Sequence, residues 1–225
     1  MRCSALAAAI LLGSGLAHAQ QVPDTLEQRL AACAACHGKR GEGLKANEYY
    51  PRIAGKPAGY LFNQLVNFRE HRRQSPAMNY IVAFLSDDYL RDIARHYAMQ
   101  APAFPPPEQQ PSSEVRARGE ALMKRGDAVR KIPACTACHG ERLTGMAPAI
   151  PGLVGLEVNY IAAQMGAWRN GLRRAQAPDC MADIASRLEP GDIEALAAWL
   201  AFQPVELPGP LPAGSLKLPM ECGGT

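Results

Sequence analysis

Apolar residues recur at helical spacing along the chain, and the same spacing appears in both of its halves. In residues 85–97 a helix start is marked by Ser86, a typical N-cap residue, with acidic residues in the first turn. The apolar positions that follow share one helix face; they are Leu90, Ile93, Ala94 and Tyr97. A second helix, beginning at Pro190, has a matching face formed by Ile193, Leu196, Ala197 and Leu200.

Helical patterning covers other segments as well. Residues 59–69 and 159–170 form another matching pair, and residues 115–124 are predicted to form a helix that leads into the second half. The strict alternation of apolar and polar residues that is typical of a half-buried strand is nearly absent. The pattern therefore predicts an all-α protein.

The chain contains one internal repeat with a period near one hundred residues. The segment Cys33-Ala-Ala-Cys36-His37-Gly38 recurs as Cys135-Thr-Ala-Cys138-His139-Gly140, at an offset of 102 residues. Other landmarks follow in the same order at an offset of 100: Pro51, Gly55, Tyr60, Gln64 and Arg69 return as Pro151, Gly155, Tyr160, Gln164 and Arg169. Each copy is long enough to form a small core, so the repeat predicts a duplicated domain.

Proline-rich segments set the expected domain boundaries. Residues 101–113 contain five prolines, which exclude a helix or a central strand and favour a semi-rigid linker. We therefore expect a first domain in residues 20–100 and a second in residues 114–203. Residues 204–225 are again rich in proline and glycine and are expected to form an irregular tail.

The N-terminus has the features of a secretory signal in residues 1–19. Arg2 gives a positive start, a short apolar run follows in residues 5–12, and Ala17-His18-Ala19 forms a small-x-small cleavage site. The run is too short to span a bilayer comfortably. We expect export and a mature chain that begins at Gln20.

Composition narrows the classes of partner. The 225 residues contain 24 Lys and Arg against 21 Asp and Glu, a formal net charge of +3, and no block of like charge stands out. This balance does not favour a nucleic-acid-binding protein or a polybasic membrane surface. After the predicted signal, no apolar stretch is long enough to suggest a membrane span.

The cysteines divide into groups with different expected chemistry. Of the seven, Cys3 leaves with the predicted signal, and four lie in the two C-x-x-C-H motifs. Cys180 and Cys222 remain. Disulfides persist in exported proteins, so these two residues could form a bridge, but sequence alone does not establish that they are close.

C-x-x-C-H is the attachment motif of c-type haem. On a helical turn, residues i, i+3 and i+4 share a face, so Cys33, Cys36 and His37 can all reach one planar ligand. The two thiols form thioethers with the haem vinyl groups and the imidazole binds the iron. The same chemistry is expected of Cys135, Cys138 and His139, which predicts two covalently bound haem c groups.

Other uses of paired cysteines fit less well. A zinc ribbon places its two C-x-x-C pairs much closer together than Cys36 and Cys135, and zinc does not require a histidine after each pair. A thioredoxin-like site needs alternating strands and helices, which the pattern does not predict.

The sixth ligand of each iron decides between a carrier and an enzyme. Met78 lies 41 residues after His37, and Met181 lies 42 residues after His139, each shortly after a proline. This paired position favours both methionines as ligands over a role as ordinary core residues. His71 and His96 are alternatives without a counterpart in the second copy, and a thiolate from Cys180 is an alternative to Met181.

Several further residues are candidates for the surroundings of the haems. The carbonyls of Pro51 and Pro151 are placed to accept the free N–H of each proximal histidine. Side chains that could bond the haem propionates, or only pack, are Tyr60, Arg69, Tyr160, Trp168 and Arg169.

From about residue 26 to residue 202 the chain resembles the dihaem cytochrome c4 family of class I c-type cytochromes. The resemblance rests on the two C-x-x-C-H-G motifs, the repeated Pro-x-x-x-Gly and Tyr-x-x-x-Gln segments, and the Pro-x-Met and Pro-x-x-Met positions. It implies two tandem cytochrome c domains related by a pseudo-twofold axis. It also implies His37–Met78 and His139–Met181 ligation, and a periplasmic location. Cys180, directly before the expected second methionine ligand, departs from the pattern.

These observations predict an electron carrier rather than an enzyme. The resemblance implies a dehydrogenase or bc1-type donor and an acceptor such as a terminal oxidase, and we expect only brief docking to membrane complexes. Two alternatives stay open. One is a haem enzyme of the thiosulfate dehydrogenase type with cysteine ligation at the second haem. A dihaem peroxidase is a less favoured form of this enzyme alternative. The other is an electron-transfer subunit bound permanently in a dehydrogenase complex.

Overall fold

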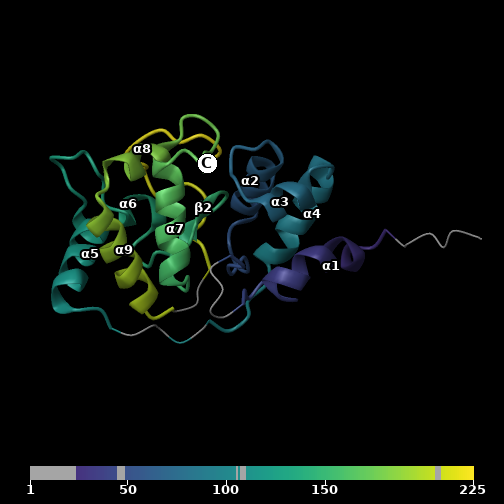
Figure 1. Cartoon of the computed structure of the whole chain (residues 1–225), viewed down its shortest axis with the longest axis horizontal. Helices are drawn as coiled ribbons and strands as arrows, with labels where there is room; N and C mark the ends of the chain where they lie inside the picture. The colour runs from purple at the N-terminus through teal and green to yellow at the C-terminus, as the bar shows by residue number, and fades with distance from the viewer. Residues whose placement is uncertain (1–23, 45–48, 105, 107–109, 206–208) are drawn as a thin grey trace, which may run out of the picture.

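The computed structural model describes residues 24–44, 49–104, 106, 110–205 and 209–225. The predicted signal in residues 1–19 lies outside them. The helices gather into two groups that lie side by side, with the C-terminus between them (Figure 1). Within the described ranges, no helix has both the length and the apolar character needed to cross a bilayer.

The first group consists of α1 (Leu26–His37), α2 (Ala58–Arg69), α3 (Pro76–Val82) and α4 (Asp87–Ala98). Ser86 caps α4 as predicted, because its side chain accepts a hydrogen bond from the amide of Tyr89. The predicted face of α4 is buried, and it packs against α2 and α1. Its members are Leu90, Ile93, Ala94 and Tyr97.

The second group consists of α5 (Ser113–Arg125), α6 (Thr136–His139), α7 (Val158–Arg169), α8 (Cys180–Arg187) and α9 (Pro190–Phe202). Two short strands, β1 (Gly145–Met146) and β2 (Ile150–Pro151), pair antiparallel and are a small exception within a helical protein. The predicted face of α9 is buried against α5 and α7. The predicted helices 59–69, 115–124 and 159–170 match α2, α5 and α7 to within two residues at each end.

A buried carboxylate fixes the start of α9. Asp192 is fully buried, and one of its oxygens accepts the backbone N–H of Glu189 at 2.9 Å. The same carboxylate pairs with Arg130 at 2.5 Å and with Arg118 at 2.6 Å. It therefore joins α9 to α5 and to the turn that precedes the second C-x-x-C-H motif.

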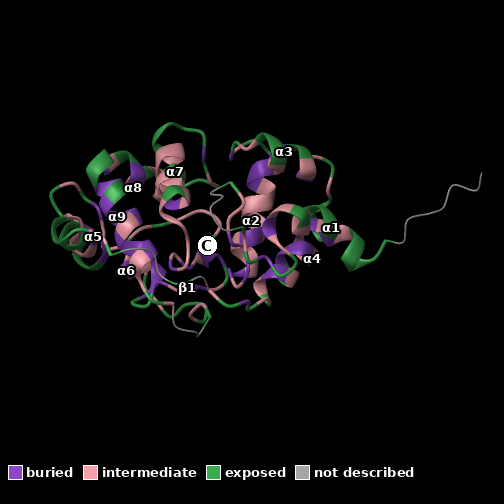
Figure 2. Cartoon of the chain, turned by 60° about the horizontal axis from the view of Figure 1, so that its bottom comes forward, coloured by how far each residue is buried: buried purple, intermediate pink, exposed green. Residues whose placement is uncertain are grey.

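Equivalent segments of the two groups meet at a backbone pairing. Arg73 and Arg173 form an antiparallel bridge, with hydrogen bonds from the amide of Gln74 to the carbonyl of Leu172 and from Arg174 to Arg72, at 2.8 and 2.7 Å. These loops follow α2 and α7, which occupy the same place in the repeat. In Figure 2 the outer turns of α1 and α5 are exposed, whereas the segments between the groups are mostly buried or half-buried. The repeat thus gives an interface with approximate twofold symmetry.

Candidate functional site

All eight residues predicted to hold the haems line one cavity of about 1110 Å³ between and within the two groups. They are Cys33, Cys36, His37, Met78, Cys135, Cys138, His139 and Met181. Cavities that hold a single small ligand measure roughly 300–1000 Å³. The size and the twofold lining therefore fit two large planar ligands placed close together.

Each C-x-x-C-H segment ends a helix at its histidine. His37 is the last residue of α1 and His139 is the last residue of α6, and a glycine follows each with φ of 82° and 80°. Residues with a side chain rarely adopt this backbone conformation. Gly38 and Gly140 therefore allow the chain to leave the helix directly after the histidine. The two cysteines and the histidine of each motif then face the cavity from one helical turn.

The two histidines are oriented by backbone carbonyls, as predicted. The Nδ1 atom of His37 lies 2.9 Å from the Pro51 carbonyl, and that of His139 lies 2.8 Å from the Pro151 carbonyl. A carbonyl only accepts, so each Nδ1 carries the proton and each Nε2 has a free lone pair. Burial lowers the pKa of both imidazoles, and a nearby cation lowers it further, namely Arg73 for His37 and Lys56 for His139. Both rings are therefore neutral, the form that binds a metal.

Three thiols of the two motifs are buried in a way that favours their neutral form. Burial raises the pKa of Cys33 and of Cys138, and it raises the pKa of Cys135 to about 11. Nucleophilic cysteines have the opposite shift, because a nearby cation or a helix N-terminus stabilises their thiolate. Attachment to a bound ligand suits these thiols better than catalysis.

The two methionines lie on short helices that polar side chains fix in place. Asn79, next to Met78, is buried, and its side-chain oxygen accepts a hydrogen bond from the amide of Ser75 at 2.8 Å. Its side-chain nitrogen donates to the carbonyls of Phe68 and Arg73 at 2.5 and 2.9 Å. Asn79 thereby ties α3 to the end of α2. Asn79 could not be singled out from the sequence, because an asparagine after a methionine forms no recognisable motif.

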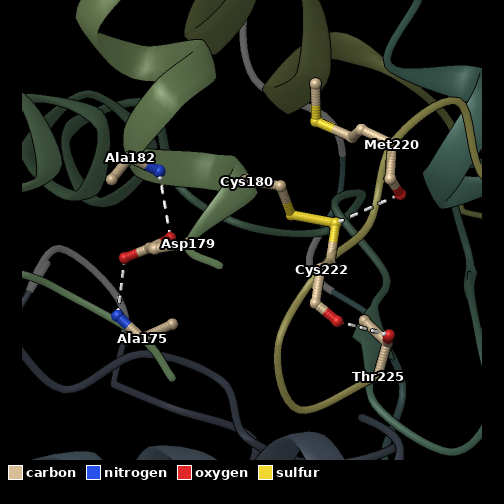
Figure 3. Close-up of a disulfide and its surroundings, with 7 residues drawn as sticks. All are labelled: Ala175, Asp179, Cys180, Ala182, Met220, Cys222 and Thr225. Carbon is tan, nitrogen blue, oxygen red and sulfur yellow. Dashed lines mark hydrogen bonds between the residues drawn. A yellow bond between two sulfur atoms is a disulfide. The ribbon is translucent and has the colours of Figure 1, made fainter. Parts of the chain in front are cut away.

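Asp179 has the corresponding task before Met181. Its carboxylate accepts hydrogen bonds from the backbone amides of Ala175 and Ala182, at 2.6 and 3.0 Å, and so caps the N-terminus of α8 (Figure 3). The two other candidate ligands of the first half, His71 and His96, are not among the residues that line the cavity. The geometry thus favours the methionines over these histidines.

Cys180 and Cys222 form a disulfide, which the sequence left open (Figure 3). The bridge ties the residue before Met181 to the C-terminal tail. The tail is also held by a hydrogen bond from the amide of Gly223 to the Pro178 carbonyl at 2.8 Å. The sulfur of Cys180 is consumed in the disulfide, so it is not available as the thiolate ligand considered above.

A pair of buried arginines lies where the two groups meet. Arg73 donates to Gln64, Gln164 and the Tyr160 hydroxyl, and Arg173 donates to Gln164, Gln64 and the Tyr60 hydroxyl, at 2.7–3.2 Å. The guanidinium groups stack on Phe68 and Trp168 at 4.5 and 3.7 Å. Among the described residues, all acceptors of these two cations are neutral. A buried like-charge pair of this kind requires an anion to compensate it.

Haem fits these groups, because its propionates are carboxylates. The Tyr97 hydroxyl and the Trp168 indole N–H line the same cavity, and both are buried without a hydrogen-bond partner in the described part of the chain. Carboxylates inside the cavity would satisfy these groups and both arginines. Arg69 is otherwise engaged, since it bonds the Leu85 carbonyl and Asp87. Arg169 is exposed.

Searches against known proteins found no matching family model. The chain is 38% identical over 175 residues to a "Thiosulfate dehydrogenase electron acceptor" of Thiomonas intermedia, covering 78% of this chain and 80% of that protein. It is 32% identical over 189 residues to a "Cytochrome c4" of Pseudomonas aeruginosa, covering 83% of this chain and 91% of that protein.

Solved structures have the same fold. Reduced cytochrome c4 from Pseudomonas stutzeri superposes with a TM-score of 0.68 at 28% identity, covering 78% of this chain and 95% of that one. Thiosulfate dehydrogenase TsdBA from Marichromatium purpuratum gives 0.67 at 34% identity over 76% of this chain. The match spans only 36% of the TsdBA chain, so it concerns one part of that longer protein.

Proposed function

Since the chain belongs to the dihaem cytochrome c4 family and carries two covalently bound haem c groups, we propose that it is an electron carrier with His37–Met78 and His139–Met181 ligation. The proposed domains are those of residues 20–100 and 114–203. Bound haem iron alternates between the ferric and ferrous states, so each site can hold one electron. The single observation that carries the proposal is the twofold arrangement of thiols, imidazole and methionine around one cavity.

The protein's own residues set the conditions for rapid transfer. Each neutral imidazole is held by a proline carbonyl, and each methionine lies on a helix fixed by Asn79 or Asp179. A thioether ligand favours the ferrous state and raises the potential. Because the ligands are fixed before the electron arrives, little rearrangement accompanies each change of charge. This is the requirement of a shuttle rather than of an enzyme.

The names of the relatives suggest the physiological donor. Two proteins at 38% identity are called thiosulfate dehydrogenase electron acceptors. We infer that the donor is a thiosulfate dehydrogenase or a related sulfur-oxidising enzyme, and that the electrons pass to an acceptor such as a terminal oxidase. From the signal expected in residues 1–19 we infer that this exchange takes place in the periplasm. The Cys180–Cys222 disulfide supports the carrier over an enzyme with a thiolate-ligated second haem.

Near-infrared magnetic circular dichroism of the ferric protein tests the ligation, because it distinguishes axial ligand pairs. We expect two His/Met signatures, of which Met78→Ala removes one and Met181→Ala removes the other. Met220 also lines the cavity, so Met220→Leu is a matched control that should leave both signatures unchanged. A thiolate or high-spin signature in the unmodified protein would contradict the proposal.

Stopped-flow spectroscopy tests the donor. The oxidised protein is mixed with thiosulfate and a thiosulfate dehydrogenase from a sulfur-oxidising bacterium, and haem reduction is followed. We expect reduction only when both enzyme and thiosulfate are present. If the haems stay oxidised although dithionite reduces them, the inferred donor is wrong while the carrier function stands.

A further inference from the structure

Lys56 breaks the symmetry of the repeat. It follows Gly55 as Leu156 follows Gly155, and both glycines have φ of 72°, so the two positions occupy the same place in equivalent turns. The two halves therefore present different side chains from one backbone position. Lys56 has an exposed fraction of only 9%, which is rare for lysine unless its ammonium is bound.

The ammonium of Lys56 reaches across to the second half. Its Nζ donates to the carbonyl of Gly152 at 2.5 Å. Gly152 directly follows Pro151, whose carbonyl orients His139 at 2.8 Å. A Cβ at Gly152 would lie 2.8 Å from the Thr144 carbonyl oxygen, so this segment also packs tightly on its other side. A cation from the first half thus binds the segment that holds the proximal histidine of the second.

The reciprocal contact does not exist. Leu156, at the equivalent position, lines a smaller cavity of about 340 Å³ together with Pro51 and Arg52, and its side chain has no donor. Arg52 is engaged elsewhere, since it donates to the carbonyls of Pro102 and Ala103 at 2.6 and 3.0 Å and stacks on Phe104. The cation near His37 is Arg73 and the cation near His139 is Lys56, and these two residues do not occupy equivalent positions in the repeat.

We propose that Lys56 is a positioning residue for the second haem: it fixes the Pro151–Gly152 segment and holds a positive charge on the His139 side, which raises the potential of that haem. The proposal rests on the proposed function, because it requires His139 to be an iron ligand. A ferric iron has one more positive charge than a ferrous iron, so a nearby cation favours the ferrous state. The effect is large where water is excluded.

The protonation of Lys56 follows from its surroundings. Burial lowers its pKa to about 7, and Arg52 lowers it as well. Carboxylates in the cavity act in the opposite direction, because an anion near an ammonium favours the charged form. The propionates of a bound haem would supply such carboxylates, because Lys56 lines the same cavity.

The test is a redox titration in which haem NMR signals separate the two sites. Lys56→Met removes the ammonium but keeps an unbranched side chain. At a fixed ambient potential, we expect the ratio of reduced to oxidised second haem to fall about tenfold, which corresponds to 59 mV for a one-electron couple. The ratio at the first haem should change much less. Lys124→Met, which removes an exposed lysine of the second half, is the control and should leave both ratios within about twofold.

A second variant separates charge from hydrogen bonding. Lys56→Gln keeps a donor for the Gly152 carbonyl without the charge, and it replaces Lys56→Met if that chain does not fold. We expect it to lower the second potential as well. If the second haem of Lys56→Gln titrates like that of the unmodified protein, the charge effect is overturned. Failure of the proposed function is distinguishable, because it would be detected in the unmodified protein as the loss of a His/Met signature.

Discussion

At the scale of single residues, the carboxylate of Asp192 shows how much one buried group can contribute to the stability of the folded protein. It is fully buried, it caps α9, and it binds Arg118 and Arg130, which are partly exposed. Removing one member of a fully buried ion pair costs about 3–5 kcal/mol. Because water reaches both arginines, we expect Asp192→Asn to lower the free energy of unfolding by roughly 2–3 kcal/mol. Urea unfolding at neutral pH measures the loss.

The pH dependence of this loss has a definite sign. Burial raises the pKa of Asp192, but the hydrogen bond from Arg130 and the other contacts outweigh burial and lower the pKa overall. A carboxyl with a lowered pKa stabilises the folded state above its unfolded pKa of about 4, and this is lost as the pH falls through the folded value. The difference between Asp192→Asn and the unmodified protein should therefore shrink below about pH 4.

The pair of exposed Asp183 with partly exposed Arg187 is the control, since Asp183→Asn should cost less than about 1 kcal/mol. Equal losses from the two variants would contradict the role given to Asp192.

Single residues also mark where sequence reasoning succeeds. The four cysteines and two histidines of the C-x-x-C-H motifs could be placed together, because a helical turn fixes their geometry. The methionines were found from their equivalent positions in the repeat, and their ligation stays a prediction. Asn79 and Lys56 could not be found, because their partners are backbone carbonyls brought near only by the tertiary fold.

At the scale of elements, the crossing of α5 and α9 depends on the absence of a side chain. A Cβ at Gly119 would lie 2.4 Å from the Ala195 carbonyl oxygen and 2.7 Å from the Trp199 side chain. We expect Gly119→Ala to lower the free energy of unfolding by about 1–3 kcal/mol, as overpacked cores do. Chemical denaturation measures it.

Gly166 on α7 is the matched control. A Cβ there would have nothing within 4 Å, so Gly166→Ala adds only helix propensity. It should stabilise the protein by up to about 1 kcal/mol. If both substitutions shift the unfolding midpoint in the same direction, close packing at the crossing does not explain Gly119.

The elements differ in how well their patterns predict them. The helices α4 and α9 are long enough for several apolar residues to repeat on one face, and both faces are buried as expected. The helices α3 and α8, of 7 and 8 residues, are too short for such a pattern. They are held by local bonds to Asn79 and Asp179, and also by two contacts between residues distant in sequence, the bond from Asn79 to the Phe68 carbonyl and the Cys180–Cys222 disulfide. The predicted signal in residues 1–19 lies outside the described residues and stays a prediction.

At the scale of the whole molecule, the C-terminal tail connects the two groups of helices. The disulfide fixes it to α8, and the Gly224 carbonyl accepts a hydrogen bond from Asn63 on α2 at 2.7 Å. We expect the double variant Cys180→Ser, Cys222→Ser to release the tail and to lower the free energy of unfolding by about 2–4 kcal/mol, the usual contribution of a disulfide.

Limited trypsin digestion measures the release of the C-terminal tail, because Lys217 is exposed and lies before Cys222 in the sequence. Cleavage after Lys217 should be several times faster in the double variant, whereas cleavage at Lys124 on α5 should not change. In the unmodified protein, a cleaved tail stays attached until the disulfide is reduced. An unchanged rate at Lys217 would mean that contacts other than the disulfide hold the tail.

The disulfide also has a consequence for how the protein is made. In one chain, Cys33, Cys36, Cys135 and Cys138 must reach their haems as thiols, whereas Cys180 and Cys222 must be oxidised. An oxidant strong enough to form the bridge can also close a C-x-x-C pair, and a closed pair has no thiol left for thioether formation. Assembly therefore needs an order, in which a reductant keeps the four thiols open until attachment. A host that supplies only oxidant would accumulate chains with a correct tail and a missing haem.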